Sequence, residues 1–553
     1  MFTCKNLYVP APNSAFNIIS DASVDFEDGE MNAVIGPSGC GKTTLVKAML
    51  GIIPSTGKIS LNGKQISKTE DLIGQIGFAP QFTCAYPMLT VEESIQSALD
   101  ISVADSHIKK SRLEHILGVI GLSEHRTKLV SSLSGGQLRR LGLGIELANN
   151  PQIMCCDEVT SGLDPLSENA ILDLLSDLCK TEGKTFICII HNLAKLNYFK
   201  NITVIFEGEI VFRGDLPALL SYFEIDNALL LYDKLNEYEI SYWREKYENY
   251  KSDKSLEVTL SETQNTTRPS LISQFLFLLA RRYKLFFRDT TYLTLTMLIT
   301  FGFPLIVVIF AIGGLPQIET LALERNLGAI EEIKRALEVQ MTTANTSSLV
   351  TGLILFQVIL LALMGANTSA REIAAERNLY EKERLIGLKP VAYVLSKITF
   401  VSSIAIFQGI WMCGFVKLIC KFPGSFIEQA SILALVCLAM TLICLAFSAI
   451  LSSPDKANTL SIYLVGFQLP LSGIVLALPI ILKWCCRPFI TIYWGWAGYM
   501  AAMKDSPIYD AYMQTMQSTT YIPSLNTCAT ALMIQTIFAI VLIAWGCKRK
   551  IWN

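Results

Sequence analysis

The stretch of the sequence best suited to chemistry is a glycine-rich loop that ends in a lysine and two threonines. It runs Gly36-Pro-Ser-Gly-Cys-Gly-Lys-Thr-Thr44, after the apolar run 31–35 and before residues 45–50, which have the pattern of a helix. Strand, G-x-x-x-x-G-K-[ST] and helix in this order predict a phosphate-binding loop, in which backbone N–H groups surround phosphate oxygens. Lys42 is expected to reach the β- and γ-phosphates, and the Thr43 hydroxyl to ligate Mg²⁺. The predicted ATP contacts of this loop are Gly36, Pro37, Ser38, Gly39, Cys40, Gly41, Lys42, Thr43 and Thr44.

Two adjacent acidic residues follow another short apolar run and suit the same nucleotide. Asp157 comes directly after Ile153-Met-Cys-Cys, and a carboxylate at the end of a buried strand can ligate Mg²⁺. Glu158 is next in the chain, where it is expected to orient or deprotonate a water molecule in line with the γ-phosphate. The pair therefore predicts hydrolysis of the nucleotide as well as binding.

Two further polar residues end strand-like segments and complete a candidate catalytic group. Gln81 ends the segment from residue 76, and its amide is expected to ligate Mg²⁺ or the attacking water. His191 ends the apolar segment 186–190 and is expected to contact the γ-phosphate. Either residue alone is more often an ordinary structural residue, so the prediction depends on the combination. The predicted catalytic residues are Glu158, His191 and Gln81, and the predicted metal ligands are Thr43, Gln81 and Asp157.

The segment Leu133-Ser-Gly-Gly-Gln137 opens a helix and predicts a second anion-binding helix N-terminus. One nucleotide does not need two such sites from the same chain. The segment is therefore expected to contact a nucleotide held by a second copy. The predicted contacts of this kind are Ser134, Gly135, Gly136, Gln137 and Asp164.

The composition separates a soluble first half from an apolar second half. Hydrophobic residues make up 51% of the 553 residues, and the mean hydropathy is +0.41. The formal net charge of −2 does not favour nucleic acid as a partner. The first 30 residues lack the pattern of a signal peptide, which predicts a cytosolic N-terminal part. None of the 15 cysteines has metal-site spacing, so most are expected to be reduced and structural; a disulfide among Cys485, Cys486 and Cys528 is a separate option.

Six uncharged segments in the second half are long enough to cross a membrane. They are residues 293–312, 347–370, 398–416, 430–451, 457–482 and 525–547. Basic residues cluster before the first segment, between the second and third, and after the last, whereas the loop after the first is net acidic. By the positive-inside rule, this predicts a multi-pass protein with both termini in the cytosol, in the plasma membrane or an internal membrane.

The order of these features predicts three parts. Residues 1–226 form an α/β nucleotide-binding domain, residues 227–270 a polar linker, and residues 271–553 an all-α membrane domain with six spans. Residues 271–289 alternate apolar and basic side chains, which predicts an amphipathic helix at the cytosolic membrane face. Residues 488–503, in the long loop before the last span, are expected to dip into the outer leaflet.

Residues 1 to about 225 resemble the nucleotide-binding domain of ATP-binding cassette (ABC) proteins, because all the segments above occur in that family's order. Val159 departs from the proline usual there. A cassette followed by six spans resembles the G subfamily, and so do the charged loop 371–387 and Leu471-Ser-Gly-Ile. The segment 133–137 corresponds to the signature segment of cassette proteins, and it is closer to the general cassette form than to that subfamily's glutamate-ended version. The resemblance implies an ABC-2 (type V exporter-like) half-transporter that pairs with a second half-transporter, most simply as a homodimer but also as a heterodimer.

The resemblance also predicts a class of cargo. The resemblance implies export of lipids, sterols or amphipathic compounds. Export of a glycan or a drug, and an ATPase that regulates a membrane partner, are the alternatives. Cargo is expected between the second and fifth spans, lined by Phe356, Met364, Phe467 and Leu471. The charged segment 371–397 is expected to form a short helix that rests on the cassette near Gln81, and Glu376 and Arg377 within it to transmit movement. The aromatic residue that stacks on adenine is expected to be Tyr8 or Phe16.

Overall fold

The computed structural model divides the chain into two compact units. Residues 1–274 and 378–389 form the first, here called the cassette unit; residues 275–377 and those from 390 onward form the second, the membrane unit. The structure describes residues 1–11, 16–66, 69–251, 268–311, 329–476, 478–516 and 521–549. Much of the predicted linker, and of the acidic loop after the first predicted span, lies outside the described residues.

The cassette unit is built on a six-stranded sheet with the order β10-β9-β3-β8-β7-β6. Its strands are β3 (Met31–Ile35), β6 (Ile76–Ala79), β7 (Ile153–Asp157), β8 (Thr185–Ile189), β9 (Asn201–Phe206) and β10 (Glu209–Gly214). Neighbouring strands are parallel except for β9 and β10. Every residue of β3, β6, β7 and β8 is buried, which explains why these segments are continuous apolar runs in the sequence. Parallel strands bring their carboxyl ends, and the residues that follow them, to one edge.

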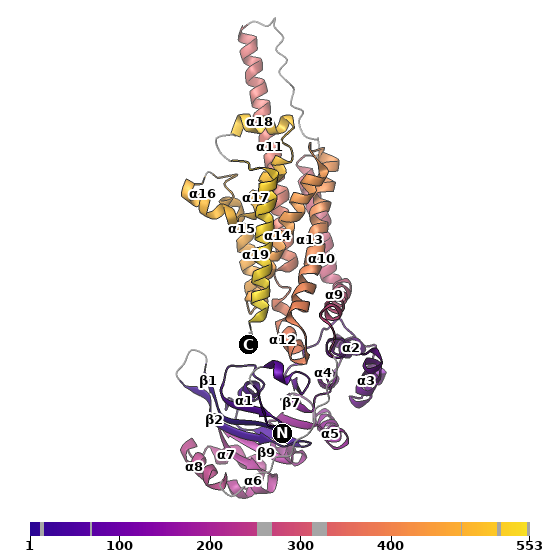
Figure 1. The fold of residues 1–553 in the computed structure, drawn as a ribbon, viewed down its shortest axis with the longest axis vertical. Coiled ribbons are helices and arrows are strands. Elements are labelled where there is room, and N and C mark those ends of the chain that lie inside the picture. The colour runs from indigo at the N-terminus through magenta and orange to yellow at the C-terminus, as the bar shows by residue number, and fades with distance from the viewer. Residues whose placement is uncertain are drawn as a thin grey trace. The chain divides into compact units, whose positions relative to one another are not determined.

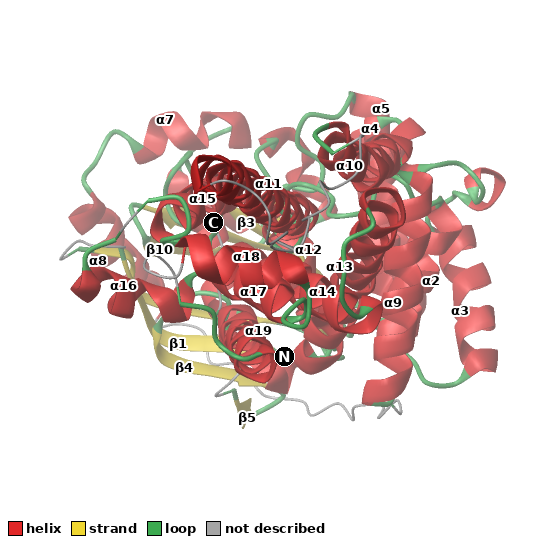
Figure 2. Cartoon of the chain, turned by 90° about the horizontal axis from the view of Figure 1, so that it is seen from above, coloured by secondary structure: helices red, strands yellow, loops and turns green. Residues whose placement is uncertain are grey.

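A second, antiparallel sheet has the order β2-β1-β4-β5. Figure 2 shows β1 and β4 side by side in it. The strands are β1 (Phe2–Pro10), β2 (Asn17–Phe26), β4 (Thr56–Leu61) and β5 (Lys64–Gln65). The helices of the cassette unit are α1 (Lys42–Met49), α2 (Val91–Ser102), α3 (Ser106–Val119), α4 (Gly135–Leu147), α5 (Pro165–Glu182), α6 (Leu216–Phe223), α7 (Leu231–Leu235) and α8 (Ile240–Lys251). Short 3₁₀ helices lie at Thr69–Leu72, Ser123–His125, Val130–Ser132, Leu193–Tyr198 and Ala228–Leu230.

The segment from residue 227, expected to be linker, begins with helices that pack on the cassette. Trp243 of α8 is fully buried, and its indole Nε1 donates a hydrogen bond to the carbonyl oxygen of Leu235 at 3.1 Å. The ring lies 5.0 Å from that of Phe223 at the end of α6. The charged and aromatic composition of 238–250 therefore reflects an amphipathic helix with one buried aromatic face.

The helices of the membrane unit are α9 (Leu271–Arg288), α10 (Thr290–Ile309), α11 (Ala329–Ser369), α13 (Pro390–Cys420), α14 (Phe426–Ile450), α15 (Pro454–Leu471), α16 (Ile480–Cys486), α17 (Thr491–Ala501), α18 (Pro507–Met516) and α19 (Leu525–Lys548). Figure 1 shows the long helices α13, α14 and α19 side by side. Two 3₁₀ helices lie at Ala374–Glu376 and Arg487–Phe489, and α12 (Arg377–Ile386) begins in this unit and continues in the cassette unit.

Helix α14 is the centre of the bundle and packs against α11, α13, α15, α17 and α19. Glycines bring three of these neighbours close to it. A Cβ added at Gly365 of α11, Gly409 of α13 or Gly546 of α19 would lie 2.5 to 2.8 Å from atoms of α14. Close approach through small residues is a common basis of helix association in membranes, because lipid offers no hydrophobic driving force between helices.

Five described segments are long and apolar enough to cross a membrane: Thr290–Ile309, Gln340–Ile386, Pro390–Cys420, Phe426–Ile450 and Leu525–Lys548. They overlap five of the six predicted spans. The fifth predicted span, 457–482, is not one continuous helix, because α15 ends at Leu471. Pro470 lacks an N–H group and weakens the last turn, and Gly473 then takes a positive φ of 70°. Residues 491–501, expected to dip into the membrane, form α17, which packs against α11, α14 and α19.

The membrane unit also holds a buried cluster of paired charges. Glu372 accepts hydrogen bonds from Arg282 of α9, at 2.5 and 2.6 Å, and from Lys397 of α13, at 2.8 Å. Lys397 also donates to Glu376 at 2.6 Å. The neighbouring Arg377 is 3% exposed and donates to the carbonyl oxygens of Ala449 and Gly546 at 3.2 Å.

These contacts show which helices Glu376 and Arg377 bind, and their expected role in transmitting movement stays a prediction. The buried Arg377 joins the ends of α14 and α19, and the partly buried Glu376 binds Lys397 near the start of α13. The charge pattern of the sequence shows that partners exist but not which helix supplies them. Replacing either residue would disturb the helix bundle itself.

Candidate nucleotide site

The phosphate-binding loop lies between β3 and α1, as its sequence predicts. Helix α1 starts at Lys42, directly after Gly41, whose φ of 101° is strained for any residue with a side chain. A Cβ at Gly41 would also lie 2.6 Å from Cδ1 of Ile19. Lys42 is 5% exposed, and its ammonium group donates to the carbonyl oxygens of Gly36, at 2.9 Å, and Pro37, at 2.8 Å. The loop therefore holds its own lysine over the position where phosphate is expected.

Asp157, at the end of β7, reaches the start of α1. The Thr43 hydroxyl Oγ1 donates a hydrogen bond to Asp157 Oδ1 at 2.8 Å. Burial raises the pKa of the Asp157 carboxyl above its usual range, although the bond from Thr43 and the nearby charges of Lys42 and Lys47 counteract this effect. A buried carboxylate beside a hydroxyl is a set of hard oxygen ligands, which fits Mg²⁺ bound jointly with phosphate oxygens.

Glu158 is the residue on which the catalytic prediction converges. Its Oε2 accepts a hydrogen bond from Gln81 Nε2 at 2.8 Å, and its Oε1 lies 2.6 Å from His191 Nε2. The three residues follow β6, β7 and β8, which are neighbours in the sheet. Glu158 has a φ of 52°, rare for a residue with a side chain, which marks the sharp turn by which the chain leaves β7. The carboxylate is thus held through both oxygens, beside the Asp157–Thr43 pair.

The signature segment is organised around its own helix. Ser134 caps α4: its hydroxyl accepts from the N–H of Gln137 at 3.3 Å, and the Gln137 side chain accepts from the N–H of Ser134 at 3.1 Å. Asp164 caps α5, and the bond from Ser167 is the main reason that the pKa of this carboxyl is lowered. Within the described residues, no hydrogen bond or ion pair joins segment 133–137 to the loop 36–44.

Comparisons with known proteins agree with this division of the chain. Residues 19–161 match the family described as "ABC transporter", and residues 273–503 match the family described as "ABC-2 type transporter". The chain joins an ABC-type nucleotide-binding domain to an ABC-2-type membrane domain. In the first of these domains, the residues assigned to ATP from the sequence are the ones that meet in space, apart from the signature segment and Asp164.

Three curated relatives each match a little over a third of this chain, in the ABC domain. A methionine import ATP-binding protein of Geobacillus kaustophilus is 32% identical over 216 residues, which is 37% of this chain and 62% of that protein. Proteins of the same description from Haemophilus influenzae and Enterococcus faecalis are 32% and 34% identical over 217 and 203 residues, or 38% and 35% of this chain. The chain spans 63% and 59% of the length of these two relatives.

The ABC domain contains a link between Gln81 and the signature helix that the sequence motifs do not reveal. Thr83, two residues after Gln81, donates from Oγ1 to the carbonyl oxygen of Leu138 in α4 at 3.3 Å. The guanidinium of Arg139 lies 6.0 Å from the ring centre of Phe82. Burial lowers the pKa of Arg139, and the charge of Glu158 counteracts this effect. Arg139 of α4, which no motif singles out, is therefore a positive charge in the surroundings of Glu158.

The two candidate adenine-stacking residues differ in their surroundings in the ABC domain. The main chain and side chain of Ile18, at the start of β2, lie within 4 Å of a Cβ added at Gly41 of the phosphate-binding loop. Phe16 comes two residues earlier and is 67% exposed. Desolvation is the main reason that the pKa of the Tyr8 phenol is raised, and the charge and hydrogen bond of Asp21 raise it further. Phe16 is thus near in sequence to a residue beside the loop, and the choice between Phe16 and Tyr8 stays a prediction.

The residues expected to line a cargo path are differently exposed in the ABC-2 domain. Phe467 of α15 is 62% exposed, and Leu471 is partly buried against the core. Phe356 of α11 is also partly buried, and its ring lies 5.8 Å from that of Phe310. Met364 is 1% exposed inside the bundle, where contact with cargo would require the core to repack. Cys485, Cys486 and Cys528 all carry free thiols, and no disulfide joins them.

Proposed function

We propose that the chain is an ATP-driven half-transporter whose ABC domain hydrolyses ATP to move cargo through the ABC-2 domain. The observation that carries this proposal is the arrangement of Glu158 between Gln81 and His191, next to the Asp157–Thr43 pair. A nucleotide-binding module without turnover does not need a carboxylate held at this position. The ABC-2-type domain in the same chain supports coupling of the reaction to transport.

Each group near the site has a specific task in this reaction. Lys42 leaves the carbonyl oxygens of its own loop and donates to the β- and γ-phosphates, which the loop N–H groups also contact. Glu158 accepts a proton from the attacking water. At the same time the water oxygen bonds to the γ-phosphorus, and the bond between the γ-phosphorus and the oxygen that leaves with ADP breaks. Gln81 and His191 orient that water and the γ-phosphate. Thr43 and Asp157 would hold Mg²⁺, which neutralises phosphate charge when bound.

The working unit in this proposal is a dimer. The signature segment caps its own helix and has no bond to the phosphate-binding loop among the described residues, so a second chain must supply the groups opposite the γ-phosphate. The predicted contacts Ser134, Gly135, Gly136, Gln137 and Asp164 belong to this role. A homodimer would have two equal sites, because every motif is present in one chain; a heterodimer with a related half-transporter uses the same contacts.

We further assign the chain to the G subfamily and propose export of lipids, sterols or amphipathic compounds. The order of the two domains and the loop 371–387 support the subfamily. Six spans, with α15 as the fifth, would place both termini in the cytosol of a plasma or internal membrane. The exposed Phe467 on α15 supports apolar cargo. Export of a glycan or a drug is the second candidate, and regulation of a membrane partner the third.

The test is ATP turnover of the full-length protein in nanodiscs, with Glu158→Gln compared with wild type. Hydrolysis is expected to fall about 100-fold or more while ATP binding persists, because the amide keeps the shape but accepts no proton. Glu209→Gln is the matched control: both glutamates are 16% exposed, and each has two side-chain nitrogen atoms within hydrogen-bond distance of its carboxylate. Equal rates in wild type and Glu158→Gln would refute the assignment. Stimulation of wild-type turnover by a lipid, but not by a drug panel, separates the cargo candidates, and no stimulation favours a regulator.

A further inference from the structure

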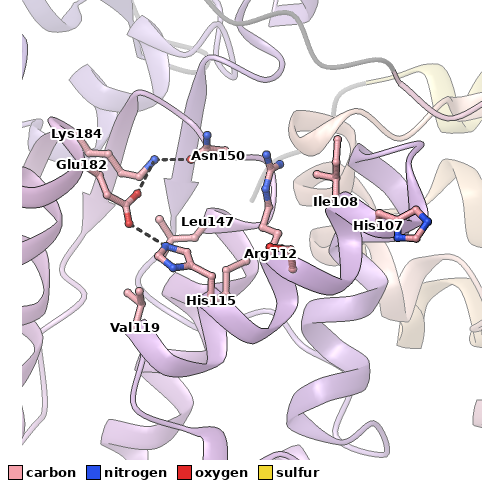
Figure 3. Close-up of a pocket in the computed structure, with 11 residues that line it drawn as sticks. His107, Ile108, Arg112, His115, Val119, Leu147, Asn150, Glu182 and Lys184 are labelled. Atoms are coloured by element: carbon pink, nitrogen blue, oxygen red, sulfur yellow. Dashed lines mark hydrogen bonds and ion pairs between the residues drawn. The ribbon is translucent and has the colours of Figure 1, made fainter.

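The cassette unit contains a cavity of about 520 Å³ that the ATP site does not use. Figure 3 shows it between α3 and the segments that precede two strands of the sheet. A volume of this size is in the range of small-molecule sites. It is lined by His107, Ile108, Ser111, Arg112, His115, Ile116, Val119, Leu147, Asn150, Glu182 and Lys184.

This cavity lies at the opposite edge of the sheet from the catalytic residues. Asn150 precedes β7, which runs to Asp157, and Lys184 directly precedes β8, which is followed by His191 two residues after its end. A strand of five residues extends about 16 Å. A molecule in the cavity therefore cannot be the nucleotide of the phosphate-binding loop.

The charged groups around the cavity are unevenly paired. Glu182 contacts two side chains on one side, the Lys184 ammonium at 3.4 Å and the His115 imidazole at 3.0 Å. Lys184 is 3% exposed and donates to Asn150 Oδ1 at 2.7 Å and to the carbonyl oxygen of Pro151 at 3.0 Å. The single carboxylate of the cavity is thus already shared.

Arg112 has no such partner. Its Nη1 donates to the carbonyl oxygen of Ala148 at 3.2 Å, and no described carboxylate pairs with it. Desolvation lowers the pKa of Arg112, and no acidic group opposes this effect. The charged guanidinium is therefore less favourable here than in water as long as no anion is bound. A guanidinium has five N–H donors in a planar fork, so Arg112 can still bind both oxygens of an anionic group.

The remaining wall of the cavity is apolar. Ile108, Ile116 and Val119 of α3 face it together with Leu147 at the end of α4. An inorganic ion would leave this apolar surface in contact with water. An organic anion would cover the surface while its charged group binds Arg112.

We propose that the cavity binds a small organic anion, whose carboxylate or phosphate group accepts hydrogen bonds from Arg112 and whose apolar part packs on Ile108, Ile116, Val119 and Leu147. Such a ligand would join α3 to the starts of β7 and β8 and would stabilise the native ABC domain in proportion to its occupancy. The site is separate from the ATP site and does not depend on turnover.

The test measures binding and thermal stability of the full-length protein with saturating ADP, which occupies the phosphate-binding loop. Four probes separate the features of the ligand: phenyl phosphate, benzoate, inorganic phosphate and the neutral benzyl alcohol. At least one of the two aromatic anions is expected to bind and raise the melting temperature, and the stronger of them identifies the anionic group. Inorganic phosphate and benzyl alcohol are expected to bind at least tenfold more weakly.

Arg112→Gln is expected to weaken the better probe at least tenfold. Arg140→Gln is the matched control, since Arg140 also donates one hydrogen bond to a main-chain carbonyl, at 3.3 Å from Ile120, and does not line the cavity. If Arg112→Gln fails to fold, Val119→Trp, which fills the apolar end without changing a charge, must abolish binding instead. Equal binding to wild type and these variants, or no binding of either aromatic anion, would overturn the proposal.

Discussion

The most quantitative prediction concerns a buried ion pair between α12 and the signature helix. Lys382 Nζ lies 2.8 Å from Glu146 Oε1, and each side chain is 2% exposed. The two atoms lack the geometry of a hydrogen bond, so charge attraction holds them together. The other carboxylate oxygen, Oε2, accepts from the N–H of Phe78 at 3.3 Å. Lys382→Met would leave Glu146 buried with only that one neutral donor.

Removing one partner of a buried pair costs about 3–5 kcal/mol, because the remaining charge is neither solvated nor compensated. For a domain of this size, that corresponds to roughly 2 °C in melting temperature per kcal/mol. We therefore expect Lys382→Met to lower the melting temperature of the cassette unit by about 6–10 °C. Glu146→Gln should cost a similar amount, because it leaves the lysine charge buried.

The double variant decides whether the pair itself is responsible. Lys382→Met with Glu146→Gln removes both charges and keeps an oxygen for Phe78, so much of the lost stability is expected to return. Lys109→Met is the control, because Lys109 Nζ lies 2.6 Å from Asp100 Oδ1 but these side chains are 16% and 19% exposed. The expected loss of stability for this more exposed pair is below about 1 kcal/mol. Scanning calorimetry of wild type, Lys382→Met, Glu146→Gln and the double variant completes this double-mutant cycle. Additive losses, or a drop below about 2 °C in Lys382→Met, would refute the reasoning.

Three further predictions concern the ATP site. Lys42→Ala should weaken ATP binding at least tenfold in equilibrium titration, because it removes a charge from the phosphate-binding loop; unchanged affinity would contradict this role. Phe16→Ala should weaken ATP binding more than Tyr8→Ala does, and the reverse order would assign adenine stacking to Tyr8. Burial raises the pKa of Asp157, so ionisation at neutral pH costs the native state stability, and this cost sets in as the pH rises through the raised pKa. Asp157→Asn should therefore raise the melting temperature at pH 7 without nucleotide and nearly stop hydrolysis, and calorimetry with an ATPase assay checks both.

The catalytic group could be predicted from the sequence because it depends on local rules. Asp157, Glu158 and His191 each follow a short, continuous apolar run, and parallel strands place such residues at one edge. The motif around Lys42 requires only a strand, a turn and a helix. The order of the strands, which makes β6, β7 and β8 neighbours, was not predicted and comes from the structure.

Features that depend on the choice of a distant partner were not predictable. The charges of Glu376 and Arg377 are visible in the sequence, but their partners lie 21 and at least 72 residues away. Helix α15 has an apolar pattern that continues past its end, and the break depends on the local geometry at Gly473. The packing of Trp243 likewise needs a surface that only the folded cassette provides.

Glu146 lies where three elements of the cassette unit meet. The ion pair can therefore be tested for an effect on ATP turnover as well as on stability. Lys382 contacts it from α12, the residue itself belongs to the signature helix, and Phe78 binds it from β6, three residues before Gln81. If α12 only anchors to the cassette, ATP turnover should recover in the double variant together with the melting temperature. If the charge pair also positions Gln81 beside the catalytic carboxylate, stability should return while turnover stays low. The same four proteins thus separate an anchoring role from a transmitting one.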